Sequence, residues 1–458
     1  MFHLPMASPS HPSDELRREI GPVQATALNV ANMVGIGPFI TIPFFIAAMG
    51  GPQAMIAWVI AAVLVICDGL VWAELGAALP GSGGTWHFLR RAFAGSVWGR
   101  LLPFLFIWQF LFSGTLEIAS GYLGMMSYLD YALPWLKQTL TSWQVPGGMK
   151  TLAAFLALLV TLLLCRRTAS MGKLAVVLCA GTILTVLIVI IAGMTHFDVA
   201  KLAVPPGAWD LSPAWFGGLG AAMTIAIYDY LGYYNICHMG DEVKEPVKTI
   251  PRSIMASIAI VVTIYLTMNV AIISVVPWQE AMKSENIAAL FMERLYGPEV
   301  ARAFSWLVIW TAVACFFCIK AGYSRIPYAA AKGGDFFPVF AKLHGKHQYP
   351  WVSLLAIGVL SAVFCYFDLA DVISAAVAVR IVVQFICQIL AVRHLRRCRP
   401  DIPLPFRMWC YPLPALLAMA GWIFLLATSQ PKVLAAAAGV LGSGLLVYPI
   451  WRWSRRDS

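Results

Sequence analysis

The stretch TALNVANMVGIGPFITIPFFIAAMG, from Thr26 to Gly50, decides the fold class. It is apolar over a length greater than the roughly 20 residues that a helix needs to cross a bilayer. The residues Gly35-Ile36-Gly37-Pro38 interrupt it in the middle. Glycine and proline are common in membrane helices and often only kink them. Taken alone, this interruption predicts a kinked membrane helix.

A second apolar stretch, AAMTIAIYDYLGYYNICHMG from Ala221 to Gly240, is interrupted in a similar way. Gly232 stands at its centre, with tyrosines on both sides, among them Tyr228 and Tyr233. The two interruptions fall in the first and the sixth apolar stretches of the chain, which are matching positions of two five-helix units. A matched pair of broken helices is typical of a transporter built as an inverted repeat.

The composition of the chain excludes an ordinary soluble protein. Hydrophobic residues make up 60% of the 458 residues and charged residues 12%, whereas a soluble domain has roughly 45–50% and about 25%. Backbone groups in lipid must hydrogen-bond within their own segment, so the apolar stretches are predicted to be helices. Twelve spans are predicted, at residues 23–49, 54–78, 98–129, 150–166, 172–194, 214–238, 253–276, 301–325, 351–367, 371–394, 411–430 and 432–453.

The distribution of basic residues predicts the orientation. With the N-terminus inside, 23 of the 32 lysines and arginines fall in inner segments and 7 in outer ones. Such a bias favours a cytoplasmic membrane protein with both termini in the cytoplasm. The net charge of +10 follows from this topology and gives no reason to expect nucleic acid as a partner. The first twenty residues contain no apolar run that would indicate a cleavable signal peptide.

The two breaks offer complementary chemistry to a zwitterion. The half-helix that begins near Gly37 carries partial positive charge and exposed N–H groups at its N-terminus, which suits a carboxylate. Carbonyl groups released between Tyr228 and Leu231 can accept hydrogen bonds from an ammonium group. One break for each end of an amino acid is therefore predicted.

Four motifs resemble those of the amino acid–polyamine–organocation superfamily, and they occur in the order found there. The first is the Gly35-Ile36-Gly37 break. The others are AELGAALPGSGGTWHFLRRAFAG (residues 73–95), GDEVKEPVKTIPRSI (residues 240–254) and SRIPYAAAKGGDFFP (residues 324–338). The resemblance implies an all-α integral membrane fold of 12 transmembrane helices. It comprises a five-plus-five inverted repeat, with helices 1 and 6 discontinuous, and two C-terminal helices.

The predicted organisation is a cytoplasmic segment at 1–22, a ten-helix transport core at 23–394, and helices 11 and 12 with a short cytoplasmic tail at 395–458.

The resemblance also implies a substrate site. The substrate carboxylate would lie on the backbone of Gly35, Ile36 and Gly37. The amine would meet carbonyl groups near Tyr228 and Leu231, with Tyr233 beside the break at Gly232. Two departures from the family pattern bear on this site. Ile36 stands where many members have serine or threonine, and the fifth helix has Thr182 near the place where many members have a lysine.

Ionisable residues at bilayer depth are costly and by default suggest a function. Glu117, Asp229 and Arg380 fall near mid-membrane, and Lys320 lies nearer the cytoplasmic end of its span. Glu117 and Arg380 can form a buried pair. Alternatively, Glu117 or Asp229 can carry a proton or balance a cationic substrate. Lys320 either snorkels to the interface or replaces the missing lysine of the fifth helix.

These observations predict a secondary active transporter of amino acids that works by alternating access, as a proton symporter or an exchanger. The alternative is a carrier of cationic amino acids or polyamines. A channel or receptor is disfavoured by the paired breaks. An enzyme is disfavoured because no HExxH, GxSxG or phosphate-binding glycine loop occurs. No catalytic residue, metal or cofactor is predicted; the expected partners are a small amine or amino acid, protons and the lipid bilayer.

Overall fold

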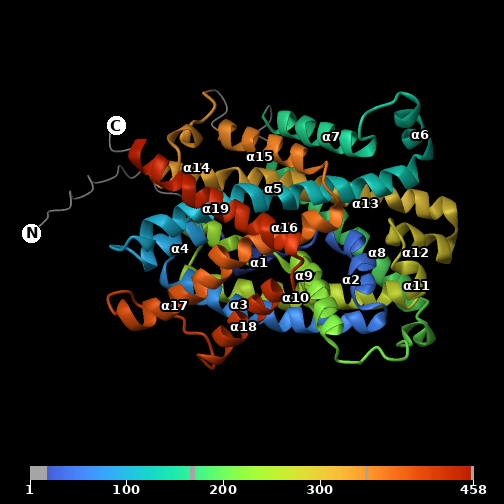
Figure 1. The fold of residues 1–458 in the computed structure, drawn as a ribbon, viewed down its shortest axis with the longest axis horizontal. Helices are drawn as coiled ribbons and strands as arrows, with labels where there is room; N and C mark the ends of the chain where they lie inside the picture. Colours follow the sequence, from blue (N-terminus) through green and yellow to red (C-terminus); the bar gives the residue numbers. More distant parts are fainter. Residues whose placement is uncertain (1–17, 166–170, 346–348, 455–458) are drawn as a thin grey trace, which may run out of the picture.

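The computed structural model describes residues 18–165, 171–345 and 349–454. These residues form helices and connecting loops, with only two isolated β-bridges, Ile20 with Val243 and Ser82 with Met239. Figure 1 shows long helices running side by side along the longest axis of the molecule, with shorter helices at both ends. Part of the predicted cytoplasmic segment, residues 1–17, lies outside the described residues, as do Arg166, Arg167, Lys346, Arg455 and Arg456.

The first half of the chain contains eight α-helices in its described part. They are α1 (Pro22–Met33), α2 (Gly37–Met49), α3 (Met55–Ala78), α4 (Thr85–Ala92), α5 (Trp98–Ala132), α6 (Pro134–Ser142), α7 (Met149–Leu164) and α8 (Met171–Thr195). A short 3-10 turn, η1 (Pro52–Ala54), precedes α3, and another, η2 (Val199–Leu202), follows α8.

The described second half begins with α9 (Pro213–Tyr230), the 3-10 turns η3 (Asn235–His238) and η4 (Gly240–Glu242), and α10 (Pro246–Ile273). It continues with α11 (Trp278–Ala281), α12 (Ile287–Tyr296), α13 (Pro298–Tyr323), α14 (Arg325–Lys332), the turn η5 (Pro338–Ala341), and α15 (Trp351–Phe364). A π-helical turn, η6 (Ile381–Ile386), joins α16 (Leu369–Arg380) to α17 (Cys387–Cys398), and α18 (Leu413–Thr428) and α19 (Pro431–Ser454) end the fold.

Several described helices are long and apolar enough to cross a bilayer. Six meet both conditions: Pro52–Ala78, Trp98–Ala132, Pro246–Ile273, Pro298–Lys332, Leu369–Cys398 and Pro431–Trp453. Four shorter apolar helices are Met149–Leu164, Ala180–Thr195, Trp351–Phe364 and Leu413–Thr428. Each of the twelve predicted ranges thus coincides with helical structure, although the number of crossings stays a prediction.

The first predicted break is present as a bend between two helices. Residues 34–36 lie between α1 and α2, and the two helix axes differ in direction by 54°. Gly37 and Pro38 open α2, where a missing N–H and a fixed φ do not disturb the helix. The bend follows from these residues because Gly35 and Pro38 both disfavour a continuous helix.

The second break lies directly against the first. Helix α9 ends at Tyr230, and Gly232 has φ +113°, in the region that favours glycine. A Cβ atom at Gly232 would lie 2.6 Å from Asn32 Nδ2 and 3.2 Å from Met33 N. Only a residue without a side chain allows the two breaks to approach so closely.

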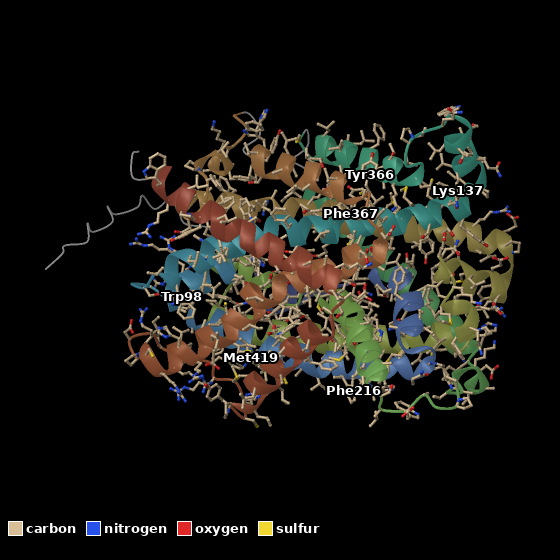
Figure 2. The ribbon with its side chains drawn as sticks, in the orientation of Figure 1. Trp98, Lys137, Phe216, Tyr366, Phe367 and Met419 are labelled. Atoms are coloured by element: carbon tan, nitrogen blue, oxygen red, sulfur yellow. The ribbon has the colours of Figure 1, made fainter. Side chains whose placement is uncertain are left out.

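Apolar side chains cover the flanks of the bundle, where lipid would surround it. Figure 2 shows Phe216, Phe367 and Met419 on these flanks; Phe216 is 43% and Phe367 54% exposed. Helix α18 packs on α3 and α9, and α19 packs on α5 and α16. The last two helices therefore lie against the remainder of the bundle, and the boundary predicted at residue 394 stays a prediction.

Candidate functional site

A cavity with an empty volume of about 440 Å³ lies where the two breaks meet. Seven predicted residues line it: Gly35, Ile36, Gly37, Glu117, Tyr228, Asp229 and Leu231. They come from the α1–α2 break, from α5 and from the end of α9. At the two breaks, some backbone N–H and C=O groups have no partner within a helix. The N-terminus of α2 and the C-terminal end of α9 both face this cavity, so these groups are directed at one small volume.

Asp229 occupies the position that the sequence predicted for a substrate carboxylate. Its Oδ2 atom accepts a hydrogen bond of 2.6 Å from Thr41 Oγ1 in α2. Its Oδ1 atom lies so close to Gly37 that a Cβ atom there would be 2.0 Å away. Oδ1 is buried and has no hydrogen-bond partner among the described residues. The protein's own carboxyl group therefore lies at the positive end of α2.

Tyr228 is fixed to helix α5 by a hydrogen-bond chain. Its hydroxyl lies 2.6 Å from Ser120 Oγ, which in turn lies 2.6 Å from the carbonyl oxygen of Glu117. Ser120 has one hydroxyl proton, and the carbonyl can only accept, so we assign Tyr228 as the donor to Ser120. The ring of Tyr228 thus forms a wall of the cavity between α9 and α5.

Glu117 and Arg380 form the ion pair that the sequence left as one of two alternatives. Arg380 Nη2 lies 2.5 Å from Glu117 Oε2, and the Tyr323 hydroxyl donates to the same oxygen at 2.9 Å. The side chain of Arg380 is only 1% exposed and that of Glu117 only 11%. The Tyr234 hydroxyl accepts a further bond from Arg380 Nη1 at 3.4 Å. The pair balances its own charge, and breaking it would leave a buried charge uncompensated.

Lys320 is buried but does not line the cavity. Its ammonium group donates to Ala157 O at 2.6 Å, Thr161 Oγ1 at 2.9 Å and Tyr122 OH at 3.1 Å. These acceptors belong to α5 and α7 and match the three hydrogens of an ammonium group. Among the residues that the structure describes, the ammonium group has no hydrogen bond to α1 or to α8, which carries Thr182. The idea that Lys320 replaces a fifth-helix lysine gains no support from this geometry, and neither does snorkelling.

Gly232 and Tyr233 also lie outside the cavity lining. The Tyr233 hydroxyl donates to Asp68 Oδ2 at 2.5 Å, and Trp422 Nε1 donates to Asp68 Oδ1 at 3.0 Å. Asp68 is a buried residue of α3, and Trp422 belongs to α18. Gly232 contributes by permitting the close approach of the breaks. Tyr233 fixes the segment after Gly232 to Asp68 of α3, which also accepts the bond from α18.

The sequence interpretation missed the contribution of α13 and part of α5. Cys315, Phe316 and Ile319 line the cavity from one face of α13. Their spacing of three and four residues is the signal of a shared helix face, but nothing in the sequence shows what that face contacts. Gly121 lies one turn after Glu117 and lines the same wall. A Cβ atom at Gly35 would lie 2.7 Å from Cys315 Sγ, so α13 packs directly on the first break.

Comparisons with known proteins agree on one family. Residues 20–448 match the family model described as "Amino acid permease". The branched-chain amino acid permease BcaP of Bacillus subtilis (strain 168) is 24% identical over 97% of this chain and 94% of its own. The human large neutral amino acids transporter small subunit 2 is 26% identical, covering 94% of this chain and 80% of its own. The serine/threonine exchanger SteT of Bacillus subtilis (strain 168) is 24% identical, with 90% and 91% covered.

Proposed function

The chain belongs to the amino acid permease family, and we propose that it carries amino acids by alternating access as a secondary active transporter. It is a multi-pass membrane permease and not an enzyme. The observation that supports the mechanism is the cavity between the two breaks, lined by Gly35-Ile36-Gly37 and by Tyr228, Asp229 and Leu231. The protein would span the cytoplasmic membrane with twelve helices in a five-plus-five inverted repeat, and both termini would face the cytoplasm.

The substrate is proposed to bind with its carboxylate at the N-terminus of α2 and its ammonium group near Leu231. Asp229 already lies at that N-terminus, against Gly37. Two carboxylates at one site repel each other, and one of them is then readily protonated. We therefore propose that Asp229 takes up a proton before or together with the amino acid. This sequence of events would couple amino acid uptake to protons.

The alternative substrate is a cationic amino acid or a polyamine, for which Glu117 was a candidate counter-charge. The structure gives Glu117 less support in this role than the sequence did. The charge of Glu117 is balanced by Arg380 at 2.5 Å, so it is not available as a counter-charge unless that pair opens. Among the described lining residues, Asp229 is the carboxylate that has a buried oxygen without a hydrogen-bond partner and no cationic side chain bonded to it. An arginine, lysine or polyamine substrate would have to use this group.

The test is uptake by purified protein in proteoliposomes, with radiolabelled alanine, leucine, arginine and putrescine, with and without an inward proton gradient. We expect gradient-stimulated uptake of a neutral amino acid by the wild type. D229N should lose the stimulation and keep exchange between preloaded and external amino acid, because an amide accepts a bond from Thr41 but cannot release a proton. D210N, which changes an exposed aspartate in the loop before α9, should behave like the wild type.

Other outcomes of the same assay are equally decisive. Full gradient stimulation in D229N would overturn the proposed role of Asp229 and leave amino acid transport standing. Selective uptake of arginine or putrescine would favour the cationic alternative. Saturable uptake of none of the four compounds, by protein that is helical and monodisperse, would contradict the proposed substrate class.

A further inference from the structure

A second cavity, well separated from the breaks, lies at the end of the molecule that holds α4 and the last turns of α19 (Figure 1). Its empty volume is about 850 Å³. Arg90 of α4, Arg100 in the first turn of α5 and Arg452 in the last turns of α19 line it, together with Asp335 and Tyr448. We call it the arginine cavity. The positive-inside distribution predicts that this end faces the cytoplasm.

The arginine cavity has an excess of positive charge. Arg90 lies 3.1 Å from Asp335 Oδ2, donates to Gly333 O at 3.2 Å and stacks on Trp86, so its position is fixed within the protein. Arg100 and Arg452 have no ion pair with any residue in the described ranges. Three arginines against one aspartate therefore leave two guanidinium groups beside an open volume. Guanidinium groups bind phosphate through paired, charge-assisted hydrogen bonds.

Exposed apolar residues, which we call the rim, stand at or close in sequence to residues that line the arginine cavity. Trp98 follows Val97 at the start of α5, and the two are 58% and 66% exposed; Figure 2 labels Trp98 at this end of the molecule. Ile450 and Trp453, which are near Arg452 in the sequence of α19, are 66% and 70% exposed. Exposed tryptophans are typical of the membrane–water interface. The site thus places cationic groups beside apolar surface at headgroup depth.

We propose that the arginine cavity binds an anionic phospholipid of the adjacent leaflet. Arg100 and Arg452 hold its phosphate, and its acyl chains lie along Trp98 and Trp453. Basic pockets between membrane helices on the cytoplasmic side suit such headgroups. A soluble phosphate would bind the arginines but would make no contact with the exposed tryptophans. The rim therefore favours a lipid. The site would join α4 and α5 to α19, the last helix of the fold.

The test measures how the full-length protein binds phosphatidylglycerol and phosphatidylcholine. Native mass spectrometry would detect the bound lipid while lipid is removed in steps. We expect saturable retention of phosphatidylglycerol and its preference over phosphatidylcholine. R100Q/R452Q should weaken phosphatidylglycerol binding by about 30-fold, because each arginine near an anionic surface contributes on the order of a tenfold change or somewhat less. R252Q/R325Q, which removes two exposed arginines predicted to lie on the same side, should bind like the wild type.

Three results would overturn the proposal. One is equal retention of the two lipids by the wild type, a result that does not depend on any variant folding. Another is equal loss of phosphatidylglycerol binding in R252Q/R325Q, which would indicate attraction to the basic surface in general. The third is binding of glycerol 1-phosphate as tight as that of phosphatidylglycerol, which would mark a site for a soluble phosphate. Amino acid uptake is not a readout here, so the outcome is independent of the proposed transport function.

Discussion

Gly37 combines two requirements at one position, because it opens helix α2 and it contacts Asp229. A Cβ atom there would lie 2.0 Å from Asp229 Oδ1 and 3.1 Å from its carboxyl carbon. Contacts under about 3 Å force one group to move, and the carboxyl group is also held by Thr41. The identity of residue 37 is therefore tied to the position of the carboxyl group, and not only to the bend of the helix.

We expect G37A to reduce amino acid uptake to background while the protein still folds. The added methyl group would displace Asp229 from the N-terminus of α2 and fill the space next to the cavity. The control is G439A in α19, where an added Cβ meets nothing within 4 Å and alanine favours the helix by up to about 1 kcal/mol. Uptake in proteoliposomes and thermal melting would be measured for both. Normal uptake by G37A would contradict the proposed site.

His87 is a second residue whose environment gives a definite expectation. It lies in α4, outside the predicted spans, and a Cβ atom at Gly81 would be 2.8 Å from its Nε2. Burial, followed by the positive charge of Arg91, lowers the pKa of His87 to about 4, against a partial opposing effect of Asp241. The folded protein therefore keeps this imidazole neutral under conditions in which the unfolded chain protonates it.

The sign follows from linkage: the unfolded state binds the extra proton below its pKa of about 6.5, so stability falls as the pH falls towards 4. Between pH 6.5 and 5 the loss from this one group is about 2 kcal/mol. H87N should melt with a smaller difference between pH 7 and pH 5 than the wild type. H196N, which removes an exposed histidine after α8, should keep the wild-type difference. An unchanged pH dependence in H87N would show that His87 is protonated in the folded protein.

At the scale of helices, α3 and α17 are joined by an ion pair between a buried carboxylate, Glu74, and a partly buried arginine, Arg396. Arg396 donates to both oxygens of Glu74, at 2.6 and 2.7 Å, and Glu74 Oε2 also accepts from Met408 N at 2.8 Å. The guanidinium group stacks on the ring of Tyr411, 3.9 Å from its centroid. Glu74 is therefore a structural anchor for the segment that leads from α17 to α18.

R396Q should lower the free energy of unfolding by about 3 kcal/mol or more, because it leaves the carboxylate of Glu74 buried without its counter-charge. R397Q changes the neighbouring exposed arginine and should alter stability by less than about 0.5 kcal/mol. Thermal melting in detergent would compare the two variants. Equal stability of R396Q and the wild type would mean that hydrogen bonds from Met408 N and from solvent are enough to stabilise the carboxylate of Glu74.

The sequence predicted the elements better than their contacts, and the reason is physical. The breaks at residues 35–38 and 232 were predictable because glycine and proline act on the local backbone. The partners of Lys320 were not, because they depend on which face of α13 contacts α7. That the Tyr233 hydroxyl bonds to Asp68 and not to the cavity was not predictable, because Gly232, with φ +113°, interrupts the helical period that relates one side chain to the next. The pairing of Glu117 with Arg380 could be stated only as an alternative, since the two lie far apart in the chain.

At the scale of the whole molecule, charge and apolar surface are separated along one axis. Exposed apolar side chains such as Phe216 and Phe367 lie on the flanks (Figure 2), and the arginine cavity lies at one end with α4 and the last turns of α19. A bilayer around the flanks would therefore meet cationic groups at that end. The proposed orientation and the proposed lipid site both follow from this distribution of charge, which also gives the chain its net charge of +10.

The close approach of Gly232 to Asn32 also bears on how such a protein can evolve. The contact of 2.6 Å to an added Cβ, together with the bond of 2.9 Å from Ile236 N to Asn29 Oδ1, joins segments encoded some 200 codons apart. A recombination event between them, for example in the loop before α9, would bring together one break from each of two parental genes. Such a hybrid protein would fold and function only if the two breaks had the same packing contacts in both parents. The two breaks are therefore expected to be inherited as one unit, despite the distance between them in the gene.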